Sequence, residues 1–209
     1  MSRSRLISTV KVFVFIVALG PLAYLFVKAL QNDLGANPVE FVTHATGDTA
    51  LIFLLCSLAI TPLRKIANIP DLIRFRRMLG LYAFFYASLH LLTFVGLDHH
   101  FHWAEVLPDV YKRPFVTAGF TAWLLMVPLA LTSTTWSIRK LGGKRWQALH
   151  RLVYFSAIAG VVHYWWLVKK DITDPLIYAA ILAVLLGYRL SSKFIVGRRS
   201  ASSTLATGS

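Results

Sequence analysis

Six long apolar runs, separated by short polar segments, dominate the pattern of this chain. Each run is close to the length of about 20 residues that a helix needs to cross the hydrocarbon core of a membrane. The runs are residues 10–30, 43–63, 75–97, 115–134, 148–168 and 174–194. The pattern predicts an all-α integral membrane protein, built as a bundle of six transmembrane helices.

Composition and charge favour the same class. The 209 residues are 56% hydrophobic and 15% charged, with a mean hydropathy of +0.61, whereas roughly a quarter of a soluble domain is charged. The net charge of +13 does not indicate nucleic acid, because 17 of the 22 Lys and Arg residues fall at one end of the predicted helices. The positive-inside rule makes that end cytoplasmic and predicts an N-in/C-in topology surrounded by membrane lipid.

Three segments follow from this topology. Residues 1–9 are a cytoplasmic N-terminus, residues 10–194 the transmembrane domain, and residues 195–209 a small, polar tail predicted to be cytoplasmic and disordered. The first apolar run is too long for a signal peptide and is interpreted as an uncleaved anchor. A single cysteine, Cys56, excludes an intrachain disulfide and a thiolate cluster.

Histidines inside the apolar runs indicate a cofactor. The stretch "WQALHRLVYFSAIAGVVHYWWL" holds His150 near its cytoplasmic end and His163 thirteen positions later. At about 1.5 Å per residue, His163 lies about 20 Å further out, and His90, about 24 Å along its own helix, reaches the same outer level. Two histidines at one depth on different helices suit a haem held from both faces, with its apolar ring in the bundle. Zinc needs three or four clustered ligands, and the sequence places no carboxylate or cysteine at that depth.

Arg76 lies fourteen residues before His90 and therefore at the level of His150. If His150 binds a second haem iron, Arg76 is either an unusual axial ligand or a partner for a propionate. Arginine stays protonated, which favours propionate pairing, while topology and lipid headgroup contact explain Arg76 equally well. On an ideal helix His150 and His163 point about 140° apart, so the periodicity does not require two cofactors on one side.

The remaining histidines carry less information. His44 is placed at the start of the second helix, where a capping role is favoured over binding a quinone headgroup or assisting the outer haem. His99, His100 and His102 share an external loop, for which adventitious metal binding is favoured over a designed site.

Several segments together carry a resemblance to a known family. They are "HATGDTAL", "RRMLGLYAFFYASLH", "RPFVTAGFTAWLLMVPLALTST", "RKLGGKRWQALHRLVY" and "VVHYWWLVK". In order and spacing, from about residue 35 to 190, the chain resembles the MsrQ (YedZ) family, the haem-binding membrane subunits of bacterial periplasmic methionine sulfoxide reductases. More distantly it is similar to the ferric-reductase-like transmembrane domain.

The resemblance implies a b-type cytochrome of the bacterial inner membrane, an electron-transfer subunit rather than the catalytic one. It implies one haem b, or two, with histidine ligands at His90, His150 and His163, and FMN as a further cofactor. Electrons would come from the quinone pool or a cytosolic flavin reductase. They would pass to the periplasmic molybdopterin subunit MsrP in a heterodimer, supporting repair of oxidised proteins.

Two departures from the wider superfamily shape these expectations. Arg76 stands where oxidase-type domains carry a fourth histidine, so the outer haem is the firmer expectation of the two. The sequence also shows no FAD/NADPH domain after the sixth helix, so a quinol or a separate flavoprotein is expected as donor. The alternatives are a stand-alone transmembrane ferric reductase and, from another class, a non-redox transporter.

Overall fold

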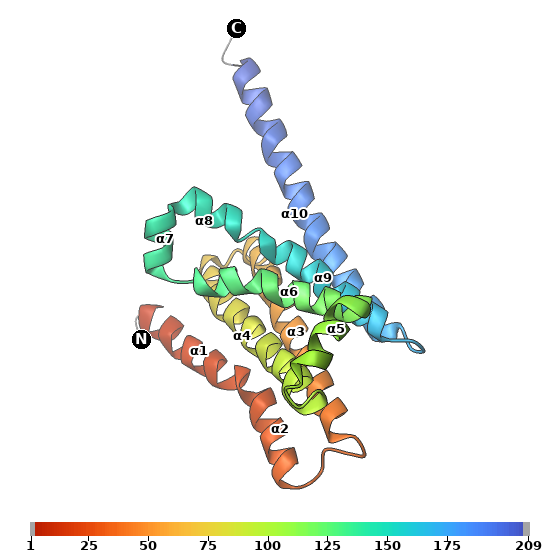
Figure 1. Ribbon diagram of the computed structural model, residues 1–209. Helices are drawn as coiled ribbons and strands as arrows, with labels where there is room; N and C mark the ends of the chain where they lie inside the picture. The colour runs from red at the N-terminus through yellow and green to blue at the C-terminus, as the bar shows by residue number, and fades with distance from the viewer. Residues whose placement is uncertain (1–2, 207–209) are drawn as a thin grey trace.

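The computed structural model describes residues 3–206, and within that range the chain is helical without a β-strand (Figure 1). The long helices are α1 (Arg3–Ala18), α2 (Gly20–Leu30), α3 (Pro38–Ile66), α4 (Ile73–Leu92), α6 (Pro114–Leu131), α9 (Leu152–Leu167) and α10 (Thr173–Ala206). The shorter elements are η1 (Pro70–Leu72), the π-helical η2 (Thr93–Asp98), α5 (Trp103–Lys112), α7 (Thr135–Leu141) and α8 (Gly143–Leu149).

Two antiparallel helix pairs form the centre of the molecule. Helix α3 packs along α4, and α6 packs along α9, with α1 beside α4, α2 against α3, and α10 against α9 (Figure 1). The interior contains small side chains, among them Ala83, Ser156 and Ala157, which are fully buried. Ser156 Oγ on α9 donates to the Ala122 carbonyl on α6 at 2.9 Å, which shows how closely these two helices approach.

Five helical segments in the described part of the chain are long and apolar enough to cross a membrane. They are Arg3–Leu30, Pro38–Ile66, Pro70–Asp98, Pro114–Leu131 and Thr173–Ser192. The predicted span 148–168 corresponds to α9, which has 16 residues and is shorter than the others. The multi-pass, all-α character is confirmed, and the sixth span and the N-in/C-in orientation stay predictions.

The stretch that carries His150 and His163 is not one continuous helix. Helix α8 ends at Leu149, His150 and Arg151 form a turn, and α9 begins at Leu152. The Arg151 N–H bonds the Ala148 carbonyl, three residues back rather than four, which tightens the chain before α9 begins. The angle of about 140° expected from an ideal helix therefore does not apply to these two histidines.

Two tyrosines of α4 hold the kink between α1 and α2. Pro21 supplies no backbone N–H, and the Tyr86 hydroxyl inserts into the helix ladder, accepting from Leu22 N at 3.3 Å and donating to the Ala18 carbonyl at 2.8 Å. Tyr82 donates to the Phe15 carbonyl at 2.8 Å. A side chain inserted into the ladder is a known cause of kinking, and here it fixes the first span to α4.

Arg189 joins α10 to α3 at another proline. Pro62 lies inside α3, so the Leu58 carbonyl has no helical donor four residues later. The Arg189 guanidinium donates to this carbonyl at 2.6 Å and lies over the Tyr154 ring, 5.2 Å from its centroid. Helix α10 continues to Ala206, beyond the predicted end of the span at residue 194 and into the segment 195–209 for which composition predicts disorder. The cytoplasmic placement of that segment and of residues 1–9 stays a prediction.

Candidate functional site

The structure brings His90 and His163 together at one end of the two central helix pairs. His90 lies near the end of α4 and His163 near the end of α9, and their ring centroids are 5.9 Å apart at an interplanar angle of 74°. Matched depth on two helices predicted this proximity. His150, the third histidine of the predicted set, lies at the other end of the bundle beside Trp146.

Each of the two rings packs against a glycine of the neighbouring helix. A Cβ on Gly47 of α3 would lie 3.0 Å from both Cε1 and Nδ1 of His90. A Cβ on Gly119 of α6 would lie 2.7 Å from Nδ1 and 2.9 Å from Cε1 of His163. All four distances are shorter than ordinary van der Waals contact, so a larger residue than glycine at either position would require the imidazole to shift.

A backbone carbonyl near each glycine determines which nitrogen of the imidazole carries the proton. His90 Nδ1 lies 2.9 Å from the Thr43 carbonyl, and His163 Nδ1 lies 2.6 Å from the Phe115 carbonyl. In both cases the carbonyl belongs to the residue four positions before the glycine. Because a carbonyl only accepts, each Nδ1 carries the proton and each Nε2 keeps a free lone pair, as in metal-ligating histidines.

A cavity of ≈ 360 Å³ lies between these rings and the four central helices. Its walls are mostly apolar, with contributions from Leu51, Leu54, Ala87, Trp123, Met126 and Gly160, among others. The polar residues around it include Asp48, Asp98 and Arg113. A few polar groups in an apolar pocket of this size are typical of a cofactor site.

The donor set fits a metal held between two imidazoles. An imidazole nitrogen lies about 2.0 Å from a bound metal, so two rings on opposite sides of one ion have centroids about 6 Å apart. The observed 5.9 Å agrees with this spacing. Among the described residues no group of three or more His, Cys, Asp or Glu side chains is arranged to hold a metal ion alone. A planar macrocycle that supplies the remaining ligands is therefore the kind of group that the residues fit.

His150 and Arg76 lie near each other, as their predicted depths require, and are separate from the cavity around His90 and His163. His150 stacks on Trp146 with centroids 3.8 Å apart, and its Nδ1 bonds the Trp146 carbonyl at 3.0 Å. Its Nε2 is buried and has no hydrogen-bond partner among the described residues, although the backbone of Leu129 lies close by. Arg76 is half-buried and within electrostatic range of this ring. Neither residue lines the cavity around His90 and His163.

Two expectations from the sequence are wrong. Helix α3 begins at Pro38, with the Asn37 side chain accepting from Glu40 N, so His44 lies inside the helix, does not cap it, and lines the cavity. Asp48 also lines the cavity, so a carboxylate does occupy the level of His90 and His163. Both errors have one cause, because placing the helix start at residue 43 shifted the depths assigned to its polar residues.

The three histidines at positions 99, 100 and 102 do not form one cluster of possible metal ligands in the described part of the chain. His99 is buried and bonded to Asp109 on α5 at 3.1 Å, and His102 precedes the first residue of α5. In the part of the chain that the structure describes, they form no metal-binding group. Sequence reasoning did not single out Gly47 and Gly119. The sequence offered only a glycine within each neighbouring helix. Such glycines are too common to be selected without knowing which helix contacts which histidine.

Comparisons with known proteins agree on one family. The family described as "Ferric reductase like transmembrane component" matches residues 46–161. A protein of Herminiimonas arsenicoxydans is 53% identical over 88% of this chain and 85% of its own length, and one of Ralstonia nicotianae is 50% identical over 87% and 84%. A third, from Rhodospirillum rubrum, is 51% identical over 86% of each chain.

All three relatives are named "Protein-methionine-sulfoxide reductase heme-binding subunit MsrQ". No solved structure matches the chain. The identities and coverage, together with the paired histidines in a membrane-helix bundle, show that this chain belongs to the MsrQ family of ferric-reductase-like membrane proteins.

Proposed function

We propose that the chain is a b-type cytochrome subunit that carries electrons across the bacterial inner membrane. His90 and His163 would hold one haem b in the cavity. The observation that carries this proposal is the pair of imidazoles 5.9 Å apart, each with Nδ1 bonded to a carbonyl. Haem bound there supplies a one-electron redox couple.

The residues of the chain prepare this site for electron transfer. The carbonyls of Thr43 and Phe115 hold each imidazole in one tautomer, in which the Nε2 lone pair is available to bind the haem. A haem held by two histidines would suit electron transfer rather than oxygen activation. The apolar cavity wall limits the access of water.

The route and the partners rest on family membership. We propose six spans with N-in/C-in topology, in which α9 adds the fifth span in chain order to the five long helical segments, so that His90 and His163 lie near the periplasmic face. Electrons come from quinol or a cytosolic flavin reductase, and leave to a periplasmic molybdopterin subunit, MsrP, that reduces methionine sulfoxide. The relatives are named as the heme-binding subunits of a protein-methionine-sulfoxide reductase, which supports this assignment.

A second haem at the cytoplasmic end is part of the proposal, with His150 as ligand and Arg76 as propionate partner. The buried Nε2 of His150, which lacks a hydrogen-bond partner, supports it. FMN is proposed on family resemblance, and the described residues give no position for it.

The proposal is tested by the optical spectrum and haem content of purified single variants. His90→Ala and His163→Ala should each remove the low-spin haem absorbance of the outer site, because one axial ligand is lost. His150→Ala should remove only absorbance that belongs to a second haem. His102→Ala, outside the cavity, is the matched control and should keep the wild-type spectrum. Full haem content in His90→Ala or His163→Ala would refute the ligand assignment.

A stand-alone transmembrane ferric reductase is the second candidate, favoured by the match to the ferric reductase family. The two functions differ in the electron acceptor. Reduced protein that is reoxidised by ferric chelates but not by the periplasmic molybdopterin subunit would support the ferric reductase.

A further inference from the structure

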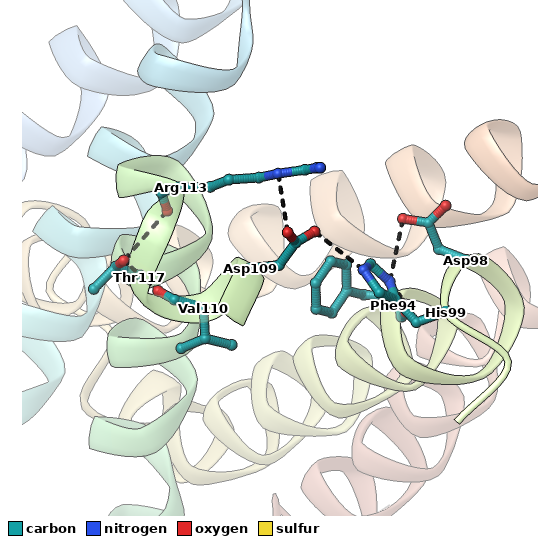
Figure 2. Close-up of polar contacts among 7 residues, drawn as sticks. All are labelled: Phe94, Asp98, His99, Asp109, Val110, Arg113 and Thr117. Atoms are coloured by element: carbon teal, nitrogen blue, oxygen red, sulfur yellow. Dashed lines mark hydrogen bonds and ion pairs between the residues drawn. The ribbon is translucent and has the colours of Figure 1, made fainter. Parts of the chain in front are cut away.

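His99, which has no role in the proposed function, is buried and joins the end of η2 to α5. His99 is only 8% exposed and packs against the Phe94 ring, 4.5 Å between centroids. Its Nε2 lies 3.1 Å from an Asp109 carboxylate oxygen, and its Nδ1 lies 3.1 Å from the Phe94 carbonyl and 3.6 Å from Asp98 (Figure 2). The imidazole therefore fixes the position of the Asp109 carboxylate.

The second oxygen of Asp109 holds Arg113. Arg113 Nε lies 3.3 Å from Asp109 Oδ1, and Figure 2 shows the guanidinium extending past the carboxylate. Among the side chains that the structure describes, residues 3–192, no hydrogen bond or ion pair involves the two terminal nitrogens of Arg113. Asp109 thus orients the guanidinium through Nε and leaves free the pair of N–H groups that binds a carboxylate in bidentate fashion.

Arg113 lies at the edge of the cavity that His90 and His163 share. It is the one Lys or Arg among the described residues that line this cavity, whereas Asp48 and Asp98 would repel an anion. A ligand that is apolar over most of its surface and carries carboxylates at one edge would therefore bind most favourably with that edge facing Arg113.

We propose that Arg113 binds a propionate carboxylate of the cofactor held by His90 and His163, with Asp109 and His99 as positioning residues. This inference rests on the proposed haem site. Structural stability alone does not explain the arrangement, because the Arg113 side chain is 54% exposed and an exposed ion pair contributes little. A buried histidine that orients an aspartate, which in turn orients an arginine, instead suits ligand binding.

The test compares haem with haem dimethyl ester, whose propionates are uncharged. Full-length protein loaded with either form is mixed with excess competing apoglobin, and the rate of cofactor loss is measured. Wild type should lose the ester about tenfold faster than haem, since a charge-assisted pair of hydrogen bonds is missing. Arg113→Gln should lose both forms at the same rate, while keeping the bis-histidine spectrum.

Neighbouring variants separate the parts of the inference. Lys112→Gln changes an adjacent exposed cation and should keep the wild-type difference. Arg113→Lys, which keeps the charge without the fork, should show an intermediate difference and serves if Arg113→Gln fails to insert. Asp109→Asn and His99→Gln should reduce the difference without changing the spectrum, and full discrimination in both would overturn the positioning roles.

Two results would overturn the binding role of Arg113. One is equal loss of both forms from wild type, and the other is wild-type discrimination in Arg113→Gln. Wild-type protein that binds neither form overturns the haem assignment itself, so the two failures are distinguishable.

Discussion

Gly119→Ala gives a sharp test of how the outer site is built. The added Cβ would lie 2.7 Å from His163 Nδ1, 2.9 Å from Cε1 and 3.1 Å from Cγ, so it meets the body of a rigid ring. Ordinary contact begins at 3.4 Å, and the ring must retreat by about 0.7 Å. That movement lengthens the 2.6 Å hydrogen bond to the Phe115 carbonyl. It also exceeds the tolerance of about 0.2 Å within which metal–ligand distances are held.

The cost can be estimated from overpacking. Inserting a methyl group into a packed interior costs about 1–3 kcal/mol, and 1.4 kcal/mol corresponds to about tenfold in affinity. We therefore expect Gly119→Ala to lower haem affinity about tenfold or more. The assay is haem per polypeptide in purified protein, together with the low-spin absorbance and its loss to a competing apoglobin.

Two other glycines provide matched controls. A Cβ on Gly80 of α4 or on Gly187 of α10 would meet nothing within 4 Å in the described part of the chain, and neither residue lines the cavity. Both lie in helices, where alanine is favoured over glycine by about 1 kcal/mol, so these variants should keep haem and be no less stable. Gly119→Ala protein with wild-type haem content and spectrum would show that His163 does not depend on the close contact with Gly119, and this account of the site would be wrong.

Two further predictions concern the helix contacts that support the site. Arg189→Met should lower the unfolding free energy by about 1–3 kcal/mol, because the Leu58 carbonyl loses its donor. This loss should be smaller in a Pro62→Ala background, because alanine restores the helical N–H that can bond the Leu58 carbonyl. Equal losses in both backgrounds would contradict the explanation. Tyr86→Phe should also lower the unfolding free energy by about 1–3 kcal/mol, because the Leu22 N–H and the Ala18 carbonyl lose the inserted hydroxyl. Tyr111→Phe, at a side chain that is 69% exposed, is the control. Both variants are measured by denaturant unfolding in detergent.

Hydropathy and charge were sufficient for the class of fold, because a membrane span is a long, uniform signal. The depth of His90 followed from the helix rise, since α4 is regular from Ile73 to this residue. The depth of His163 was counted across the turn at His150 and Arg151, yet the two rings still lie at the same level. The same arithmetic failed at His44 and Asp48, where the apolar run begins five residues after the helix does. Polar residues near a helix start carry no hydropathy signal, and the Pro38 and Asn37 capping signal was needed instead.

Interactions between helices were beyond the reach of the sequence. The turn at His150 contains neither proline nor glycine, so nothing in the local pattern announced it. The Gly47 and Gly119 seats depend on which helix faces which histidine, and the bond from Arg189 to Leu58 joins residues 131 positions apart. One-dimensional periodicity gives the face of a helix, but it does not give the partner of that face.

The two histidine–glycine contacts also explain how ligand binding can stabilise the packing of the helix bundle. His90 rests on Gly47 within the α3 and α4 pair, and His163 rests on Gly119 within the α6 and α9 pair. Each imidazole is therefore positioned by contacts within its own helix pair. A group bound by both histidines joins the pairs, and binding that occurs only when they are docked stabilises the docked state by mass action. Each helix pair thus supplies one half of the site, and the free energy of cofactor binding acts at the interface between the pairs.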